Sequence, residues 1–412
     1  MLVIRNIGEL LIVPPGPVRG GDMRRAERIP HAAVLVEGDR IAWFGAEASL
    51  NAASGCPSID ARGGCVLPGL IDCHTHTVFA GTREQEFVQR IEGKAYAQIA
   101  REGGGIAVTV EAVRKASCDE LVEPALPRLQ RMLHNGVTTV EIKSGYGLSV
   151  EDELKMLEAI RRLGDLQPIE LVPTYLAAHT TPGEFHGNSD GYLDTVFADE
   201  MLAAIRDGNL AEFCDAFCEK TAFTVEQSRR ALLAAGRFGL RPKLHADQIT
   251  QMGASRLAGE VGAISADHLE KIDDEGMAAL RKAGSIAVML PACSFFLGVE
   301  QAPARKLIEA GLPVAIATDY NPGSSMVESL PLAMTIAATQ MRLTPTECIV
   351  AAPGHAAAAL GRHERIGAIQ VGMQADLVIL DVPNHERWIY EPGRNCVRTV
   401  IKKGRVVVGE AV

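Results

Sequence analysis

The chain of 412 residues lacks the apolar segments that direct proteins into membranes or out of the cell. It has no uninterrupted apolar run of about 20 residues, the length that crosses a bilayer. Its first residues also lack a basic region followed by a long apolar stretch and a small-residue cleavage site, which is the pattern of a secretory signal. We therefore expect a cytoplasmic protein that has no membrane partner.

Basic residues are outnumbered and scattered along the chain. There are 41 Lys and Arg residues against 51 Asp and Glu residues, which gives a formal net charge of −10, and no Lys/Arg cluster offsets it. A surface of this charge repels a phosphate backbone, so we expect no nucleic-acid partner.

The nine cysteines are odd in number, and no two of them form a C-x-x-C pair. Cys214 and Cys218 come closest to that spacing. This pattern favours free, buried thiols in a reducing compartment over disulfides.

The two ends of the chain have the pattern of β-hairpins. Residues 3–13 and 32–45 are short β-rich runs, and the second turns at Gly38. Near the other end, residues 376–380 predict a strand, and residues 397–408 predict a hairpin that turns at Gly404. We predict that residues 1–64 and 366–412 form one small β-sandwich domain.

The region between the two ends, residues 65–365, alternates short apolar runs with helical stretches, which indicates βα units and a parallel α/β sheet. Thr224 with Gln227 and Thr344 with Glu347 have capping-box spacing, typical of helix starts. Eight strands over about 290 residues match a (β/α)8 TIM-like barrel. The alternative is a doubly wound open sheet, although the chain has no G-x-G-x-x-G or P-loop motif. The candidate strands are 65–72, 137–143, 169–177, 213–218, 241–246, 264–268, 285–290 and 313–319.

Two histidines, His74 and His76, follow the first of these runs. Side chains in extended backbone repeat every second residue, so the two imidazoles lie on one face. Neutral imidazole is the commonest metal ligand in proteins. Taken alone, the pair fits a metal site and ordinary core or surface histidines equally well.

Further candidate ligands stand where other strands end: His179, His245, His268 and Asp319. The carboxyl ends of barrel strands meet at one face, which forms the active site. His74, His76, His245 and Asp319 would bind one metal ion and leave a position for a water molecule, whose pKa the metal would lower. These ligand types suit Zn or Fe and do not separate the two. Singly, His245 could instead be a core histidine and Asp319 a helix cap.

Five segments of the barrel region carry a resemblance to a known family. They are PGLIDCHTHTVFAGTR (68–83), EIKSGYGL (141–148), LHADQ (244–248), ADHLE (266–270) and ATDYNPG (317–323). In these segments the chain resembles the amidohydrolase superfamily and, within it, the imidazolonepropionase family of histidine degradation. Members of that family open the ring of 4-imidazolone-5-propanoate. The resemblance implies a metal-dependent barrel enzyme with a small-molecule anionic substrate, and a homodimer.

The resemblance also assigns residues to roles. It implies metal ligation by His74, His76, His245 and Asp319. Substrate contacts would come from Arg83, Tyr146, His179 and Gln248, with Tyr96 as a further candidate, and Asn321, Gly323 and Ser324 would hold the product. Arg83 suits a propanoate because its planar fork matches a carboxylate. Tyr146 lies between two glycines, in a loop that lets a large side chain reach over a pocket.

Two positions differ from related enzymes. Many superfamily members with two metals carry a carboxylated lysine at the end of the fourth strand, whereas this run ends in Glu219 at the rim position, with Lys220 next. We therefore expect one metal ion, Zn or Fe. Gln248 stands where many deaminases have a glutamate, and an amide does not titrate. His268 and Asp319 are then the groups available for proton transfer.

The main hypothesis is a cyclic-amide hydrolase. Water activated by the metal attacks the ring carbonyl, Asp319 takes its proton, and the metal or His268 stabilises the oxyanion, giving N-formimidoyl-L-glutamate. Gln248 completes the expected catalytic set. The alternatives are a nucleobase-type aminohydrolase, a non-haem iron oxygenase and an inactive scaffold. Gln248 and an arginine suited to an anion argue against the aminohydrolase.

Overall fold

Eight parallel strands in sequential order form a barrel, which confirms the predicted (β/α)8 architecture. The structure is a computed structural model that describes residues 1–51, 55–94, 98 and 103–410. Each predicted strand of the central region has a counterpart in this sheet; the ends differ by at most three residues, except for residues 65–72, of which only 70–72 belong to the barrel. The barrel strands are β6 (Leu70–Asp72), β7 (Val137–Lys143), β8 (Glu170–Ala178), β9 (Phe213–Cys218), β10 (Arg241–Ala246), β11 (Ser265–His268), β12 (Ile286–Met289) and β13 (Val314–Ile316).

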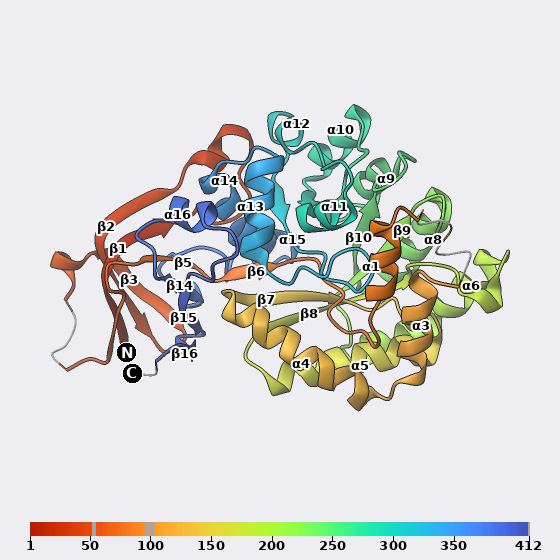
Figure 1. The fold of residues 1–412 in the computed structure, drawn as a ribbon, viewed down its shortest axis with the longest axis horizontal. Coiled ribbons are helices and arrows are strands. Elements are labelled where there is room, and N and C mark those ends of the chain that lie inside the picture. The colour runs from red at the N-terminus through yellow and green to blue at the C-terminus, as the bar shows by residue number, and fades with distance from the viewer. Residues whose placement is uncertain (52–54, 95–97, 99–102, 411–412) are drawn as a thin grey trace.

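Helices surround the barrel (Figure 1). Both predicted capping boxes are present, with Thr224 and Gln227 at the start of one helix and Thr344 and Glu347 at the start of another. The helices are α1 (Glu84–Ile91), α3 (Ile106–Lys115), α4 (Cys118–His134), α5 (Val150–Leu166), α6 (Ser189–Val196), α7 (Asp199–Asp207), α8 (Val225–Gly236), α9 (Ala254–Glu260), α10 (Asp274–Ala283), α11 (Pro291–Leu297), α12 (Ala304–Glu309), α13 (Leu330–Gln340), α14 (Pro345–Ile349), α15 (Ala356–Ala359) and α16 (His385–Tyr390).

The barrel closes just beyond the ends of its first and last strands. The Asp319 N–H donates to the His74 carbonyl at 3.0 Å, and the His76 N–H donates to the Tyr320 carbonyl at 2.9 Å. Just before these residues in the chain, the Asp72 carboxylate accepts from the Thr318 N–H at 3.1 Å and from the Thr318 hydroxyl at 2.6 Å. The residues that close the barrel therefore include His74, His76 and Asp319.

The two ends of the chain form one sheet at the side of the barrel, where both termini lie (Figure 1). Both predicted hairpins are present. Backbone hydrogen bonds also join residues 39–41 to residues 373–375: the Ile41 N–H donates to the Met373 carbonyl, and the Ala375 N–H donates to the Asp39 carbonyl. Its strands are β1 (Leu2–Ile12), β2 (Glu27–Glu37), β3 (Arg40–Ala46), β4 (Ser58–Asp60), β5 (Cys65–Pro68), β14 (Leu377–Leu380), β15 (Val397–Lys402) and β16 (Arg405–Val408). We propose that this domain extends to Pro68.

The prediction of a single strand over residues 65–72 is wrong. β5 pairs with β14 in the terminal sheet, whereas β6 pairs with β7 in the barrel. The change occurs at Gly69, where a Cβ atom would lie 2.5 Å from the Thr138 hydroxyl oxygen. Both strands are buried and apolar, so hydrophobicity alone does not reveal that the chain changes sheets.

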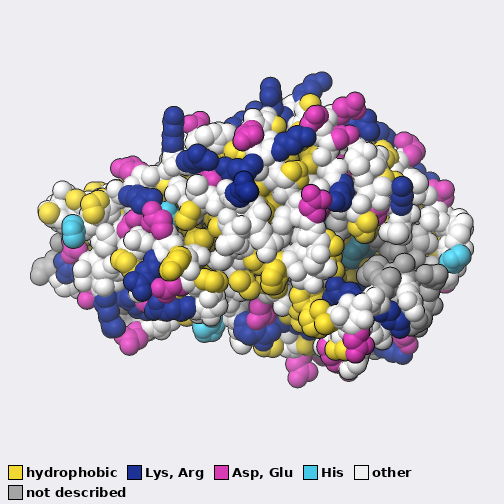
Figure 2. Space-filling view, turned by 45° about the horizontal axis from the view of Figure 1, so that its top comes forward, with side chains coloured by type: hydrophobic (Ala, Val, Ile, Leu, Met, Phe, Trp, Pro, Cys, Tyr) yellow, Lys and Arg dark blue, Asp and Glu magenta, His cyan; other side chains and the backbone are white. Residues whose placement is uncertain are grey.

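All nine cysteines are free thiols. In the described part of the chain, no helix combines the length and the apolarity needed to span a membrane. Acidic and basic side chains are interspersed over the face shown in Figure 2.

Candidate metal centre

Three of the four predicted ligands meet at the seam of the barrel. His74 and His76 follow β6, and Asp319 follows β13. His74 Nε2 lies 3.5 Å from Asp319 Oδ1, and His76 Nε2 lies 3.6 Å from the same oxygen. The three side chains are buried, and one ligand atom from each lies within 4.8 Å of the others. This spacing is short enough for one ion to bind all three.

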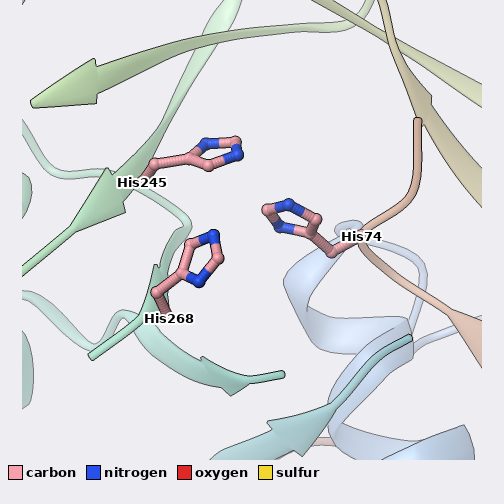
Figure 3. Close-up of side chains that lie close together, drawn as sticks. All are labelled: His74, His245 and His268. Carbon is pink, nitrogen blue, oxygen red and sulfur yellow. The ribbon is translucent and has the colours of Figure 1, made fainter. Parts of the chain in front are cut away.

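The fourth predicted ligand, His245 on β10, lies beside His74, with 4.6 Å between the ring centroids. It also forms a group of close nitrogen atoms with His74 and His268, again within 4.8 Å. Figure 3 shows these three rings pointing toward one another, His245 and His268 from strands β10 and β11 and His74 from the segment that follows β6. The structure thus brings the predicted ligands to one place and puts His268 beside them.

These residues fit a metal ion. His74 Nδ1 lies 2.7 Å from Asp267 Oδ2, which fixes the proton on Nδ1 and leaves the Nε2 lone pair free. That Nε2 is buried and has no hydrogen-bond partner among the described residues. His245 Nδ1 lies 2.9 Å from Asp215 Oδ2, so a carboxylate also stands behind this ring. A carboxylate behind each imidazole is the usual support of metal-ligating histidines.

The protonation states also suit metal binding. Burial, together with nearby positive charge, holds the pKa values of His74 and His76 well below their usual range, so both rings are neutral at pH 7. Burial raises the pKa of the Asp319 carboxyl, although the charges of His268 and His245 oppose this. Burial would lower the pKa of His268, but Glu270 and Asp319 outweigh it and raise that pKa. His268 is therefore more readily protonated than His74 or His76.

A group of fully buried charged side chains lies beneath the histidines: Glu141, Lys143, Asp215, Lys243 and Asp267. Sequence reasoning did not assign these residues to the site. Lys243 could have been suspected, because it lies two residues before His245 and therefore points to the same face of its strand. Asp215 is a single polar residue within an apolar run, and Glu141, Lys143 and Asp267 lie in runs with other polar residues, so the sequence does not single them out.

Two predicted substrate-binding residues lie against His76. The His179 ring stacks on the His76 ring, with 5.3 Å between the ring centroids, and the centroid of the Tyr146 ring lies 5.7 Å from that of His76. His179 Nδ1 lies 2.9 Å from the Gly145 carbonyl, so it carries the proton and Nε2 can accept a hydrogen bond. Burial and the charge of His245 lower the pKa of His179 to about 4, which keeps the ring neutral.

The loop that carries Tyr146 is fixed by a residue that the sequence did not indicate. The buried carboxylate of Glu153, on α5, accepts from the N–H groups of Gly145 at 3.1 Å and of Gly147 and Leu148 at 2.9 Å. Arg114 donates to the carbonyls of Gly147 and Leu148 from the other side. These bonds leave the loop little freedom, so the position of Tyr146 depends on Glu153.

The predicted Arg83 lies against the loop that follows Asp319. A Cβ atom on Gly323 would lie 2.2 Å from Arg83 Nη1, so a larger residue there would displace the guanidinium group. Arg83 Nη2 donates to Glu86 Oε2 at 2.7 Å. Asn321 Oδ1 accepts from the N–H groups of Gly323 and Ser324, which shapes the loop.

Comparisons with known proteins agree with this geometry. A profile of the Amidohydrolase family matches residues 222–407. An imidazolonepropionase from Thermoanaerobacter pseudethanolicus is 44% identical over 99% of both chains. Another, from Geobacillus kaustophilus, is 50% identical over 85% of this chain and 83% of its own length.

The chain belongs to the imidazolonepropionase family. Solved structures with the same fold include an adenosine deaminase from Xanthomonas campestris with bound zinc, with a TM-score of 0.74 and 19% identity over 100% of this chain and 94% of the other. An atrazine chlorohydrolase from Arthrobacter aurescens complexed with zinc has a TM-score of 0.71 and 20% identity over 99% and 95%. At this identity, the two structures show the fold alone.

In this member of the imidazolonepropionase family, the end of the fourth barrel strand supplies no lysine to the centre. Lys220 is exposed. Glu219 is buried, and its Oε2 accepts from the N–H groups of Ile249 and Thr250, so it shapes the loop after β10. Gln248, in that loop, is half-buried. The predicted Tyr96 lies outside the described residues.

One further residue of the site was missed. Cys293, at the start of α11, forms a third group of close ligand atoms with His268 and Asp319, within 4.8 Å. Burial and the charge of Asp319 raise the pKa of this thiol well above its usual range, so it is protonated at neutral pH. Cys293 follows β12 by four residues, too far for a pattern of strand ends to include it.

Proposed function

We propose that the protein hydrolyses the ring amide C–N bond of 4-imidazolone-5-propanoate and gives N-formimidoyl-L-glutamate, the third step of histidine degradation. The observation that carries this proposal is the orphaned, buried Nε2 of His74 among His76, His245 and Asp319, in a chain of the imidazolonepropionase family. A buried nitrogen without a partner is costly unless a ligand satisfies it.

His74, His76, His245 and Asp319 would hold one Zn or Fe ion. Such an ion, when bound, lowers the pKa of a coordinated water toward neutrality and so supplies a nucleophile. Asp319 would accept a proton from the attacking water, and its raised pKa makes the carboxylate a better base. Attack at the ring carbonyl places negative charge on its oxygen.

His268 lies beside this centre and can donate a hydrogen bond there. Glu270, with its Oε1 3.8 Å from His268 Nδ1, favours the protonated ring. A protonated His268 can stabilise the developing oxyanion and then pass a proton to the ring nitrogen as the C–N bond breaks. Gln248 cannot exchange protons and serves as a hydrogen-bonding contact to the substrate.

In this proposal, the substrate lies between the metal centre and Arg83, the residue that precedes α1. Arg83 binds the propanoate, and Tyr146 and the neutral His179 bind the ring, His179 as an acceptor for a ring N–H. The loop of Asn321, Gly323 and Ser324 holds the product. Tyr96 is proposed as a further contact, and a homodimer in the cytoplasm is proposed from the family resemblance.

The test combines elemental analysis of the purified protein with a substrate panel. We expect about one Zn or Fe ion per subunit and turnover of 4-imidazolone-5-propanoate far above that of aminopurines, aminopyrimidines and other lactams. Faster deamination of any nucleobase would refute the proposal, and so would a fully active protein without metal. Light scattering would report the mass of the assembly.

A further inference from the structure

The buried charges beneath the metal centre are joined by one side chain, Lys143 on β7. Its Nζ lies 2.9 Å from Asp215 Oδ2 and 3.6 Å from Asp267 Oδ2. Asp215 Oδ2 in turn lies 2.9 Å from His245 Nδ1, and Asp267 Oδ2 lies 2.7 Å from His74 Nδ1. A continuous series of polar contacts therefore runs from one histidine through Lys143 to the other.

We propose that Lys143 is a positioning residue of the metal centre: it holds the two carboxylates that fix the ring orientations of His245 and His74. Asp215 and Asp267 have no access to solvent, and their negative charges repel each other in the barrel interior. An ammonium group between them offsets that repulsion. This inference rests on the proposed function, because it takes both histidines as ligands.

Lys243 provides a matched control within the same cluster. It is as deeply buried as Lys143, and it donates to Glu141 Oε2 at 2.8 Å and to the Cys73 carbonyl at 3.3 Å. Within the described residues, it forms no ion pair with Asp215 or Asp267, although its charge opposes the rise in the pKa of Asp267 from a greater distance. Removing Lys243 therefore deletes a buried charge of the same sign and leaves the contacts of both carboxylates to Lys143 in place.

Glu141 allows a variant with balanced charge. Lys143 Nζ lies 2.9 Å from Glu141 Oε1, so the double substitution Lys143→Met with Glu141→Gln removes one positive and one negative charge. The net charge of the cluster stays the same, but the bridge between Asp215 and Asp267 is lost. A defect in this variant therefore does not come from a change in the net charge of the cluster, and Lys243→Met shows what loss of the Lys243–Glu141 ion pair contributes.

The experiment measures zinc affinity by competition with a chromophoric chelator for wild type and the three variants. Loss of a residue that supports metal ligands typically weakens affinity by about 10- to 100-fold, which we expect for Lys143→Met and for the double variant. Lys243→Met should change affinity by less than about threefold on the same scale. The visible spectrum of the cobalt-loaded protein should change for Lys143→Met and not for Lys243→Met, because it reports the geometry of the ligands.

Wild-type affinity for Lys143→Met, or equal losses for Lys143→Met and Lys243→Met, would overturn the inference. Circular dichroism of the metal-free proteins identifies any variant that fails to fold. If Lys143→Met is unfolded, the zinc affinity of the double variant Lys143→Met with Glu141→Gln is the test instead. Wild-type affinity in that double variant would overturn the inference. A wild-type protein that binds no metal would instead refute the proposed function, so the two failures are distinguishable.

Discussion

Glu170, at the start of β8, joins the barrel to the segments that follow it in the chain. Its carboxylate accepts from Arg362 Nε at 2.9 Å and from Arg365 Nη1 at 3.1 Å. Lys402, on β15 of the terminal sheet, has its Nζ 3.6 Å from Glu170 Oε2. The Glu170 side chain is only 16% exposed, so these interactions are weakly screened. Three cations therefore share one carboxylate between the barrel and the terminal sheet.

The pKa of Glu170 gives the size of this interaction. Burial alone would raise the pKa, but Arg365, Lys402 and Arg362 outweigh burial and lower it from 4.5 to about 2. A pKa lower by about 2.5, at 1.36 kcal/mol for each unit, corresponds to about 3 kcal/mol of folding free energy at neutral pH. Because the folded pKa is depressed, this contribution is complete above pH 4.5 and is lost as the pH falls toward 2.

The prediction is that Glu170→Gln lowers the free energy of unfolding by about 3 kcal/mol at pH 7, and that the difference from wild type shrinks as the pH falls from about 5 to 2. Urea denaturation at a series of pH values measures both quantities. The control is Glu158→Gln, which breaks an exposed ion pair with Arg161 and should cost less than about 1 kcal/mol. A difference between wild type and Glu170→Gln that does not depend on pH would refute the argument.

Three further predictions concern the active site. Glu153→Gln replaces an acceptor of three N–H groups, so the Tyr146 loop should loosen and KM should rise about tenfold in steady-state assays. The control is Glu151→Gln, at an exposed residue of the same helix, which should behave as wild type in the same assays. Arg83→Met should raise KM about 10- to 100-fold for the propanoate substrate, and an equal loss with an uncharged lactam would contradict a role in binding the carboxylate. Removal of metal by a chelator should abolish turnover and lower Tm, and added Zn²⁺ or Fe²⁺ should restore both; turnover that persists without metal would contradict the assigned centre.

The sequence predicted the barrel and the approximate site because their pattern is local. Short apolar runs recur with helices between them, and the ligands follow the runs directly, as with His74 and His76 after residues 70–72. The carboxyl ends of parallel barrel strands meet at one face, so residues far apart in the chain could be placed together without knowledge of any contact.

The support of the site could not be predicted in the same way. Asp215 is the single polar residue of an apolar strand, whereas Asp267 and Lys143 lie in strands with other polar residues. In each case only the packed barrel decides which polar side chains meet beneath the histidines. Glu153 lies on a helix, and its three bonds to the Tyr146 loop depend on how that helix packs. These residues act through contacts between distant segments, which a single sequence does not encode as a pattern.

The position of the metal centre follows from the way the barrel closes. β6 and β13 have three residues each, and the bonds that close the barrel come from the residues beyond them, including the backbones of His74 and Asp319. Asp319 has a positive φ of 53°, which is unfavourable for a residue other than glycine and is a strain typical of functional sites. Since the same residues close the barrel and carry the ligand atoms, any loosening of the seam changes the ligand geometry directly. The fold therefore sets the spacing between the two sides of the site, at the ends of β6 and β13, through its own backbone hydrogen bonds.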